Sequence, residues 1–296
     1  MPRLRRFGAL VAVLAAAAGF AVAVSAPAAA LAPRSASAGL IGTAATPGLA
    51  SISVGSASAC AIRTQGALAC WDDASGPDSV VDDAPDGTFV QVSVGTNEAC
   101  ALETDGTMHC WGDDDPSPES TFTGSSFRSV EVGTAAGATY VCGLTVDSTV
   151  TCTDGAQPGT FRQLSVADDA ACGVQTDGTL ACLGSDAQTP LPTGTFTQVA
   201  VGTHAACALQ TDSHVTCWGS DVTEPNPESG QTFSQLAMSG TIACGLETDG
   251  SVSCFGTGDD VGSSPSDTFV GIAIGSLGAC GIATTGKAEC WTGTST

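Results

Sequence analysis

Positive charge is scarce in this chain of 296 residues. It contains 8 lysine and arginine residues against 30 aspartate and glutamate residues, and Lys287 is its single lysine. A strongly acidic surface repels phosphate backbones, so nucleic acid is excluded as a partner. The acidic residues gather in segments such as 71–73 and 112–115, where solubility is a sufficient reason for them.

Histidine and the usual catalytic sequence motifs are also lacking. The chain has three histidines, His109, His204 and His214, and no nucleophile elbow, phosphate loop, metalloprotease helix or dinucleotide fingerprint. We therefore expect no catalytic residue, no bound metal and no cofactor, and hence no enzyme. Calcium is the open alternative for the acidic segments 72–87 and 113–124, but they miss the EF-hand pattern, which favours solvated loops.

Long apolar runs are confined to the N-terminus. Arg3, Arg5 and Arg6 precede an apolar run at 8–24 and a small-residue stretch at 25–32, the order of a secretory signal peptide. An uncleaved membrane anchor is the alternative, and cleavage after residue 30, 32 or 38 stays open. We predict a signal peptide at 1–32, a linker or closing strand at 33–48, and a secreted, extracellular chain without stable membrane insertion.

Cysteine is abundant by contrast, and it is spaced regularly. Seven cysteines lie 30 to 42 residues apart, and each is followed ten residues later by a second one. Together they account for all 14 cysteines: Cys60 and Cys70, Cys100 and Cys110, Cys142 and Cys152, Cys172 and Cys182, Cys207 and Cys217, Cys244 and Cys254, Cys280 and Cys290. Such a period indicates repeated supersecondary units.

Each unit has the pattern of three short strands. An alternating apolar run that ends in glycine precedes the first cysteine, and a turn such as 104–106 separates the two cysteine strands. Ser148 and Ser213 replace the left-handed glycine of this turn in two units, where some backbone strain is expected. The segments between units are rich in proline and glycine, which predicts turns rather than helices.

The turn sets the register of the two cysteine strands. Counting outward from it places Cys207 directly opposite Cys217, on a pair whose Cα atoms lie about 4.5 Å apart. This distance suits a disulfide, and we predict one in each of the seven hairpins. Zinc is the weaker alternative, because the histidines recur at no fixed position of the repeat.

Apolar residues alternate with the cysteines and give every hairpin a face that must be covered. A radial arrangement covers each face with the next blade. The sequence therefore predicts an all-β, seven-bladed propeller of three-stranded, or at most four-stranded, blades at 49–296, acting as a monomer. Four tryptophans follow second cysteines, and packing between blades is preferred to a ligand surface for them: Trp71, Trp111, Trp218 and Trp291.

The repeat at 101–112, Ala-Leu-Glu-Thr-Asp-Gly-Thr-Met-His-Cys-Trp-Gly, resembles the RCC1 repeat, and the resemblance extends over about 49–291. The Cys-Gly-Leu sequences at 142–144 and 244–246 are similar to Crinkly4-type repeats of plant receptor kinase ectodomains. The exported β-lactamase inhibitor protein II of bacteria is similar in its style of propeller. These resemblances imply a seven-bladed propeller and leave the function open, because the shared residues build blades.

We expect an extracellular protein-binding or scaffold module whose partner is an extracellular protein or an envelope component. The alternatives are an inhibitor of a secreted enzyme such as a β-lactamase, and a carbohydrate or cell-envelope binder that uses the tryptophans. The resemblance to the inhibitor implies binding through the loops between first and second strands. The candidate partner-binding residues there are Asn97, Glu98, Tyr140, Asp168, Asp169, His204, Ile242 and Leu277. Glu98 and the two aspartates could also point toward a central channel, but no nucleophile or base accompanies them.

Overall fold

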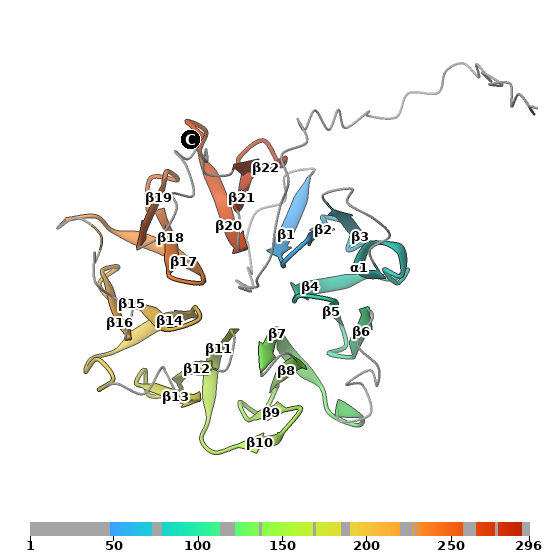
Figure 1. Ribbon diagram of the computed structural model, residues 1–296, viewed down its shortest axis with the longest axis horizontal. Coiled ribbons are helices and arrows are strands. Elements are labelled where there is room, and N and C mark those ends of the chain that lie inside the picture. The colour runs from blue at the N-terminus through green and yellow to red at the C-terminus, as the bar shows by residue number, and fades with distance from the viewer. Residues whose placement is uncertain are drawn as a thin grey trace, which may run out of the picture.

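Seven small antiparallel sheets stand around a central axis in this computed structural model (Figure 1). The structure describes residues 48–72, 79–112, 122–135, 138–167, 170–184, 190–219, 227, 230–256, 265–275 and 278–291. Six sheets have three strands and one has four, and every sheet uses strands that are consecutive in sequence. The predicted seven-bladed β-propeller is confirmed.

The strands of each blade run in order from the axis outward. Blade 1 contains β1 (Leu49–Val54), β2 (Ser58–Arg63) and β3 (Leu68–Asp72); blade 2 contains β4 (Phe89–Val94), β5 (Glu98–Glu103) and β6 (Met108–Gly112). Blade 3 contains β7 (Phe127–Ala135), β8 (Ala138–Thr145), β9 (Val150–Cys152) and β10 (Gly155–Gln157); blade 4 contains β11 (Phe161–Ala167), β12 (Ala170–Gln175) and β13 (Leu180–Gly184). Blade 5 contains β14 (Phe196–Val201), β15 (Ala205–Gln210) and β16 (Val215–Gly219); blade 6 contains β17 (Phe233–Ser239), β18 (Ile242–Glu247) and β19 (Val252–Gly256). Blade 7 contains β20 (Phe269–Gly275), β21 (Gly278–Ala283) and β22 (Ala288–Trp291).

A disulfide joins the second and third strands of every blade. Cys207 pairs with Cys217 in the register of β15 and β16, as the turn predicted, and the other six pairs occupy the same position. Their Cα atoms lie 4.0 to 4.1 Å apart. The disulfide of each blade therefore covalently fixes the register of the second and third strands that the hairpin turn sets.

The hydrophobic core lies between blades rather than within them. Each of seven clusters of buried residues combines side chains of two neighbouring blades, and the seventh joins blade 7 to blade 1. Six of the innermost strands begin with a buried phenylalanine, directly before a one-residue bulge. Because a blade buries both faces only against its neighbours, the ring must close to be stable.

One backbone hydrogen bond recurs at each joint between blades. The first residue of an innermost strand donates its N–H to the turn between the second and third strands of the preceding blade, as Phe89 does to Gly66 at 2.8 Å. Leu49 donates in the same way to Gly286 at 3.1 Å, so blades 7 and 1 pack face to face and close the ring. Residues 33–47, most of the segment predicted as a linker or closing strand, lie outside the described residues.

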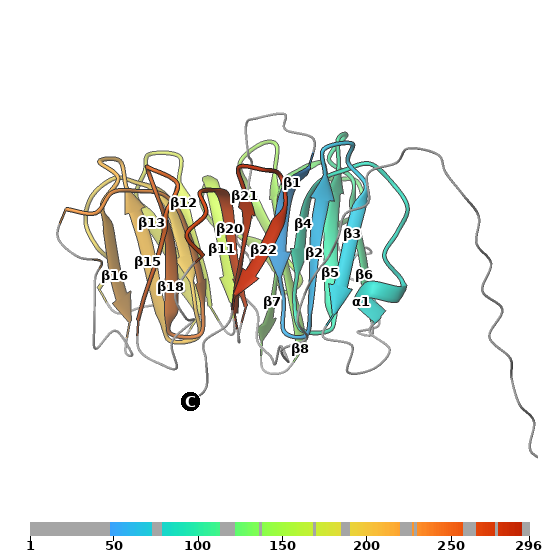
Figure 2. The ribbon, with the colours of Figure 1, turned by 90° about the horizontal axis from the view of Figure 1, so that it is seen from above.

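These contacts distinguish the two faces of the ring, which Figure 2 shows from the side. The turn face carries the turns between second and third strands together with the starts of the innermost strands. The loop face, on the opposite side, carries the turns between first and second strands.

Two features depart from the expected pattern of strands and turns. The segment between blades 1 and 2 contains a single helical turn, α1 (Ser79–Asp82), where turns alone were expected. Val80 of α1 is buried, and its carbonyl accepts a hydrogen bond from the Trp111 indole at 2.8 Å, so tertiary packing stabilises a helix that the sequence around it disfavours. In blade 3, the short segment to blade 4 forms the fourth strand, β10.

The predicted backbone strain at Ser148 and Ser213 is confirmed. Their φ angles are 70° and 71°, in the left-handed region that the other turns fill with glycine.

Candidate functional site on the loop face

Small residues and close backbone packing dominate the loop face. A Cβ atom on Gly55 would lie 2.2 Å from the Gly95 carbonyl oxygen, and one on Gly95 would lie 2.6 Å from Val132 Cγ1, so both positions favour glycine. The Ser56 hydroxyl donates to that of Thr96 at 3.1 Å and ties the same two loops together. This part of the face is therefore rigid and offers few large side chains.

The structure separates the predicted partner-binding residues by exposure. Asn97 and His204 lie in the loops of blades 2 and 5, where Asn97 is exposed and His204 is half-buried, and Ile242 is the half-buried first residue of β18 in blade 6. Glu98 is only 2% exposed, so its side chain is not available to a partner in this fold, contrary to the expectation. Asp168, Asp169 and Leu277 lie outside the described residues.

Blade 3 breaks the regularity of the face at Tyr140, the single tyrosine of the chain. Its strands β7 and β8 have nine and eight residues, whereas β4 and β5 of blade 2 have six each. Tyr140 and Glu98 both lie two residues before the first cysteine of their blades. Glu98 faces Gly112 on a full-length third strand, whereas β9 ends at Cys152 and leaves Tyr140 half-buried.

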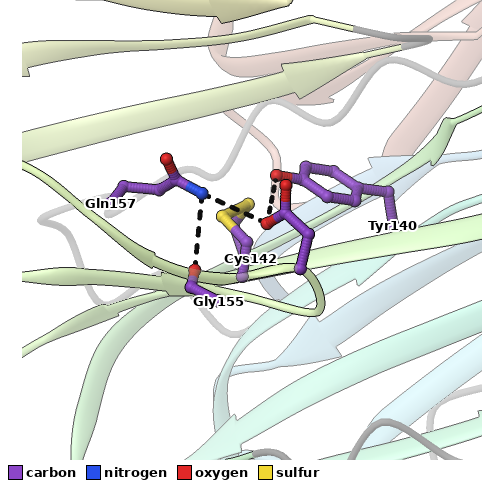
Figure 3. The surroundings of a disulfide bond; sticks show 6 residues. Tyr140, Cys142, Gly155 and Gln157 are labelled. Atoms are coloured by element: carbon purple, nitrogen blue, oxygen red, sulfur yellow. Dashed lines mark hydrogen bonds between the residues drawn. A yellow bond between two sulfur atoms is a disulfide. The ribbon is translucent and has the colours of Figure 1, made fainter.

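A polar cluster surrounds Tyr140 on the outer strands of blade 3 (Figure 3). The phenol donates a hydrogen bond to Asp154 Oδ1 at 2.9 Å, and Gln157 Nε2 donates to the same oxygen at 3.1 Å. Burial of the phenol raises the pKa of Tyr140 well above its ordinary value, and the hydrogen bond to the Asp154 carboxylate raises it further. Tyr140 is therefore a neutral hydrogen-bond donor whose ring is held in one orientation.

Three of the four tryptophans are shielded from solvent. Trp111, Trp218 and Trp291 are buried between blades, and Trp71 is half-buried against the joint of blades 1 and 7. The packing interpretation is correct for the three buried rings. A glycan surface built on these side chains loses its main support.

The described residues offer no chamber for a small ligand. The leading cavity among them, between blades 3 and 4, measures about 10 Å³, room for about one water molecule. One group in the described residues has metal-ligand spacing, Glu98 with Cys100 and Cys110. The disulfide between the two cysteines removes the thiolates that a metal would need.

Comparisons with known proteins agree with this architecture. Residues 89–115, a range that includes blade 2, match the family described as Regulator of chromosome condensation (RCC1) repeat. The chain is an RCC1-like repeat β-propeller. A comparison with curated protein sequences finds no match.

Solved structures share the fold of this RCC1-like propeller at low sequence identity. The Crinkly ectodomain of the Arabidopsis thaliana receptor kinase ACR4 is 19% identical with a TM-score of 0.64, over 89% of this chain and 96% of that one. The ectodomain of the Physcomitrella patens receptor kinase CR4 is 18% identical with a TM-score of 0.65, over 89% and 73%. Prp20p of Saccharomyces cerevisiae, described with its binding to Gsp1p and histones, is 12% identical with a TM-score of 0.61, over 90% and 93%.

Sequence reasoning missed the turn face of the RCC1-like propeller as a candidate surface. Three large apolar side chains are strongly exposed, Val90 by 51%, Val146 by 58% and Val270 by 49%, and all three lie on this face. Two of them follow the first phenylalanine of an innermost strand, a position that alignment of the repeats would have isolated. In the described part of the chain, no helix has the length and apolar character needed to cross a membrane.

Proposed function

We propose that this RCC1-like propeller is an extracellular protein-binding module without catalysis, and that it contacts its partner through the loop face around Tyr140. In this proposal residues 1–32 are the secretory signal, residues 33–48 lead into the ring, and the mature chain acts as a monomer. The observation that carries the proposal is the departure of blade 3 from the repeat. Its longer hairpin presents a half-buried tyrosine on a face of small residues.

An extension in one blade is not needed for folding, because the other blades pack with shorter strands. Half-buried aromatic residues are typical anchors of protein interfaces. The hydrogen bond from Tyr140 to Asp154 orders the ring before a partner arrives, which lowers the entropic cost of association. Asn97, exposed on the neighbouring blade, adds a side-chain amide for hydrogen bonding.

Two further observations support the extracellular setting. Disulfides persist in oxidising compartments, and every blade of this chain contains one. Two of the similar structures are ectodomains of receptor kinases.

The test is capture from culture supernatant and envelope extract of the source organism with the secreted, oxidised chain as bait. The captured protein is then titrated by calorimetry against the wild type, Tyr140→Ala and the control Gln65→Ala on the turn face. We expect Tyr140→Ala to weaken binding about tenfold or more, as for an interface anchor, and Gln65→Ala to leave it unchanged. Equal affinity of the two variants, or recovery of polysaccharide alone, would contradict the proposal. Assay of a captured enzyme with and without the propeller shows whether binding inhibits it.

A further inference from the structure

All four lysine and arginine residues of the described ranges lie on the turn face. Arg63 ends β2 directly before a turn, and Lys287 follows the turn at 284–286. Arg128 and Arg162 are the second residues of β7 and β11, whose first residues bond to turns of preceding blades. All four side chains are exposed. In so acidic a chain, this one-sided placement of positive charge requires an explanation.

The aspartates in the turns of this face are also unevenly distributed. Five consecutive blades, 2 to 6, carry an aspartate in the turn: Asp105, Asp147, Asp177, Asp212 and Asp249. Blades 1 and 7 have Gln65 and Thr285 at that position, and they carry Arg63 and Lys287 at their turns. The ring of turn aspartates is thus open at two adjacent blades, and both basic turn residues lie within this opening.

Exposed apolar side chains lie at the same opening. The second residue of the innermost strand is Val270 in blade 7, Ala50 in blade 1 and Val90 in blade 2, and all three are exposed. Because blades 7 and 2 both pack against blade 1, these residues follow one another around the ring. In blades 3 to 6, the equivalent residues are polar: Arg128, Arg162, Thr197 and Ser234.

Hydrogen bonds between blades bring the basic turns beside this apolar arc. Leu49, next to Ala50, bonds to Gly286, next to Lys287. Phe89, next to Val90, bonds to Gly66 at the end of the turn that follows Arg63. We call the surface formed by Ala50, Arg63, Val90, Val270 and Lys287 the basic sector.

We propose that the basic sector docks an acidic segment of a partner protein. Carboxylates of the segment lie against Arg63 and Lys287, and its apolar side chains cover Val270, Ala50 and Val90. Charge complementarity selects an acidic partner, and the apolar arc favours a protein segment over a purely hydrophilic polyanion. This surface lies on the face opposite Tyr140, so it is separate from the contact proposed above.

The two cations contribute unequally to this docking. Glu289 interacts electrostatically with Lys287, so an incoming carboxylate competes with this acid for the lysine. Arg63 has no acidic residue in its own turn, and its planar guanidinium can bind a carboxylate with two parallel hydrogen bonds. Arg63 is therefore the stronger contact of the pair.

The test is fluorescence anisotropy of the oxidised full chain with three dye-labelled peptides of equal length. One alternates glutamate with leucine, one alternates glutamate with serine, and one alternates lysine with leucine. We expect the glutamate–leucine peptide to bind most tightly and its affinity to fall as salt rises from about 0.1 M to about 0.5 M. Arg63→Gln should lower the affinity for the glutamate–leucine peptide more than Lys287→Gln does. The double variant should lower this affinity about three- to tenfold, as for two exposed ion pairs.

Two further variants complete the design. Val90→Ser should weaken binding of the glutamate–leucine peptide and leave binding of the glutamate–serine peptide unchanged. Asn97→Asp, which makes the same change in net charge on the loop face as Arg63→Gln does on the turn face, should leave affinity unchanged. Quantification of free thiols and circular dichroism show that each variant is oxidised and folded.

Several outcomes would overturn the inference. They are no binding of any peptide, equal binding of the two glutamate peptides, or an affinity that the double variant leaves unchanged. Dimerisation of the chain that the double variant abolishes would assign the sector to a second copy instead. A loop-face partner should retain its affinity for the double variant and lose it for Tyr140→Ala, so the two proposals fail separately.

Discussion

Gln235 of blade 6 and Ile272 of blade 7 are joined by a pair of hydrogen bonds across the blade joint. The amide Nε2 donates to the Ile272 carbonyl at 2.9 Å, and Oε1 accepts from its N–H at 3.0 Å. The same pairing recurs at three other joints, from Gln91, Gln163 and Gln198. Ser51, Ser129 and Gly271 occupy the position in the remaining blades and cannot form it. The joint that closes the ring therefore relies on apolar packing and the bond from Leu49 to Gly286.

Replacing Gln235 by leucine should destabilise the propeller by about 2–6 kcal/mol. The substitution leaves the N–H and C=O of fully buried Ile272 without partners, at about 1–3 kcal/mol for each group. Urea unfolding measures the loss, with Gln65→Leu on the exposed turn as the control. A free energy of unfolding equal to that of the control would show that the amide pairing contributes nothing.

Removing one disulfide should have a similar effect by a different route. The double variant Cys207→Ala with Cys217→Ala deletes the link that closes the hairpin of blade 5. Loop-closure entropy for a ring of this size predicts a loss of about 2–3 kcal/mol. Urea unfolding of oxidised protein tests it, and no change in the midpoint would contradict it. Full reduction of the wild type should destabilise the fold more, since it opens all seven rings.

Ser213 should tolerate glycine with a gain in stability. Its φ of 71° strains a serine, and glycine relieves the strain while losing more entropy on folding, so we expect a net gain below about 1 kcal/mol. The reverse change, Gly178→Ser in blade 4, should cost about 1–2 kcal/mol, because φ there is 92°. Thermal unfolding of both variants should show opposite shifts, and shifts of the same sign would refute the strain argument.

The strand register could be predicted because two constraints repeat in every blade. The three-residue turn and the ten-residue cysteine spacing both place Cys207 opposite Cys217. Exposure of loop residues could not be predicted in the same way. Glu98 and Tyr140 occupy the same position in the repeat, and their different burial depends on how far the third strand continues opposite them.

The basic sector was hidden for a related reason. Arg63 and Lys287 are 224 positions apart in the sequence and belong to different blades. Alignment of the turns shows that they belong to the two blades without turn aspartates. The hydrogen bond between Leu49 and Gly286 and the apolar cluster shared by blades 7 and 1 make those two blades neighbours. Ring closure is a long-range property that repeat spacing alone does not reveal.

The turn aspartates should make stability depend on acid pH. Hydrogen bonds from the Thr179 hydroxyl and N–H lower the pKa of Asp177 below its ordinary value of 3.8. A depressed folded pKa means that the ionised aspartate stabilises the turn above the unfolded pKa, and this contribution is lost as pH falls through the folded pKa. Asp177→Asn keeps an acceptor for the Thr179 N–H without the charge. We expect the wild type to exceed this variant in stability near neutral pH and the difference to disappear in acid, below about 3.8. A stability difference between the two proteins that persists in acid would show that the charge of Asp177 does not cause it.

Tyr140 allows a titration of one residue, because no other tyrosine contributes to the phenolate absorbance. Burial and the Asp154 carboxylate raise its pKa, so the folded protein should form phenolate only well above pH 10.0, the ordinary value. Asp154→Asn removes the negative charge and should move the titration back toward that value, while Asp147→Asn, on the turn face, should not. Because the folded pKa is raised, the protonated phenol stabilises the fold below the unfolded pKa, and the advantage is lost as pH rises through the folded pKa. Ultraviolet difference absorbance under native conditions measures the pKa of the Tyr140 phenol. If the wild type titrates at the ordinary pKa, Asp154 does not hold the phenol in solution.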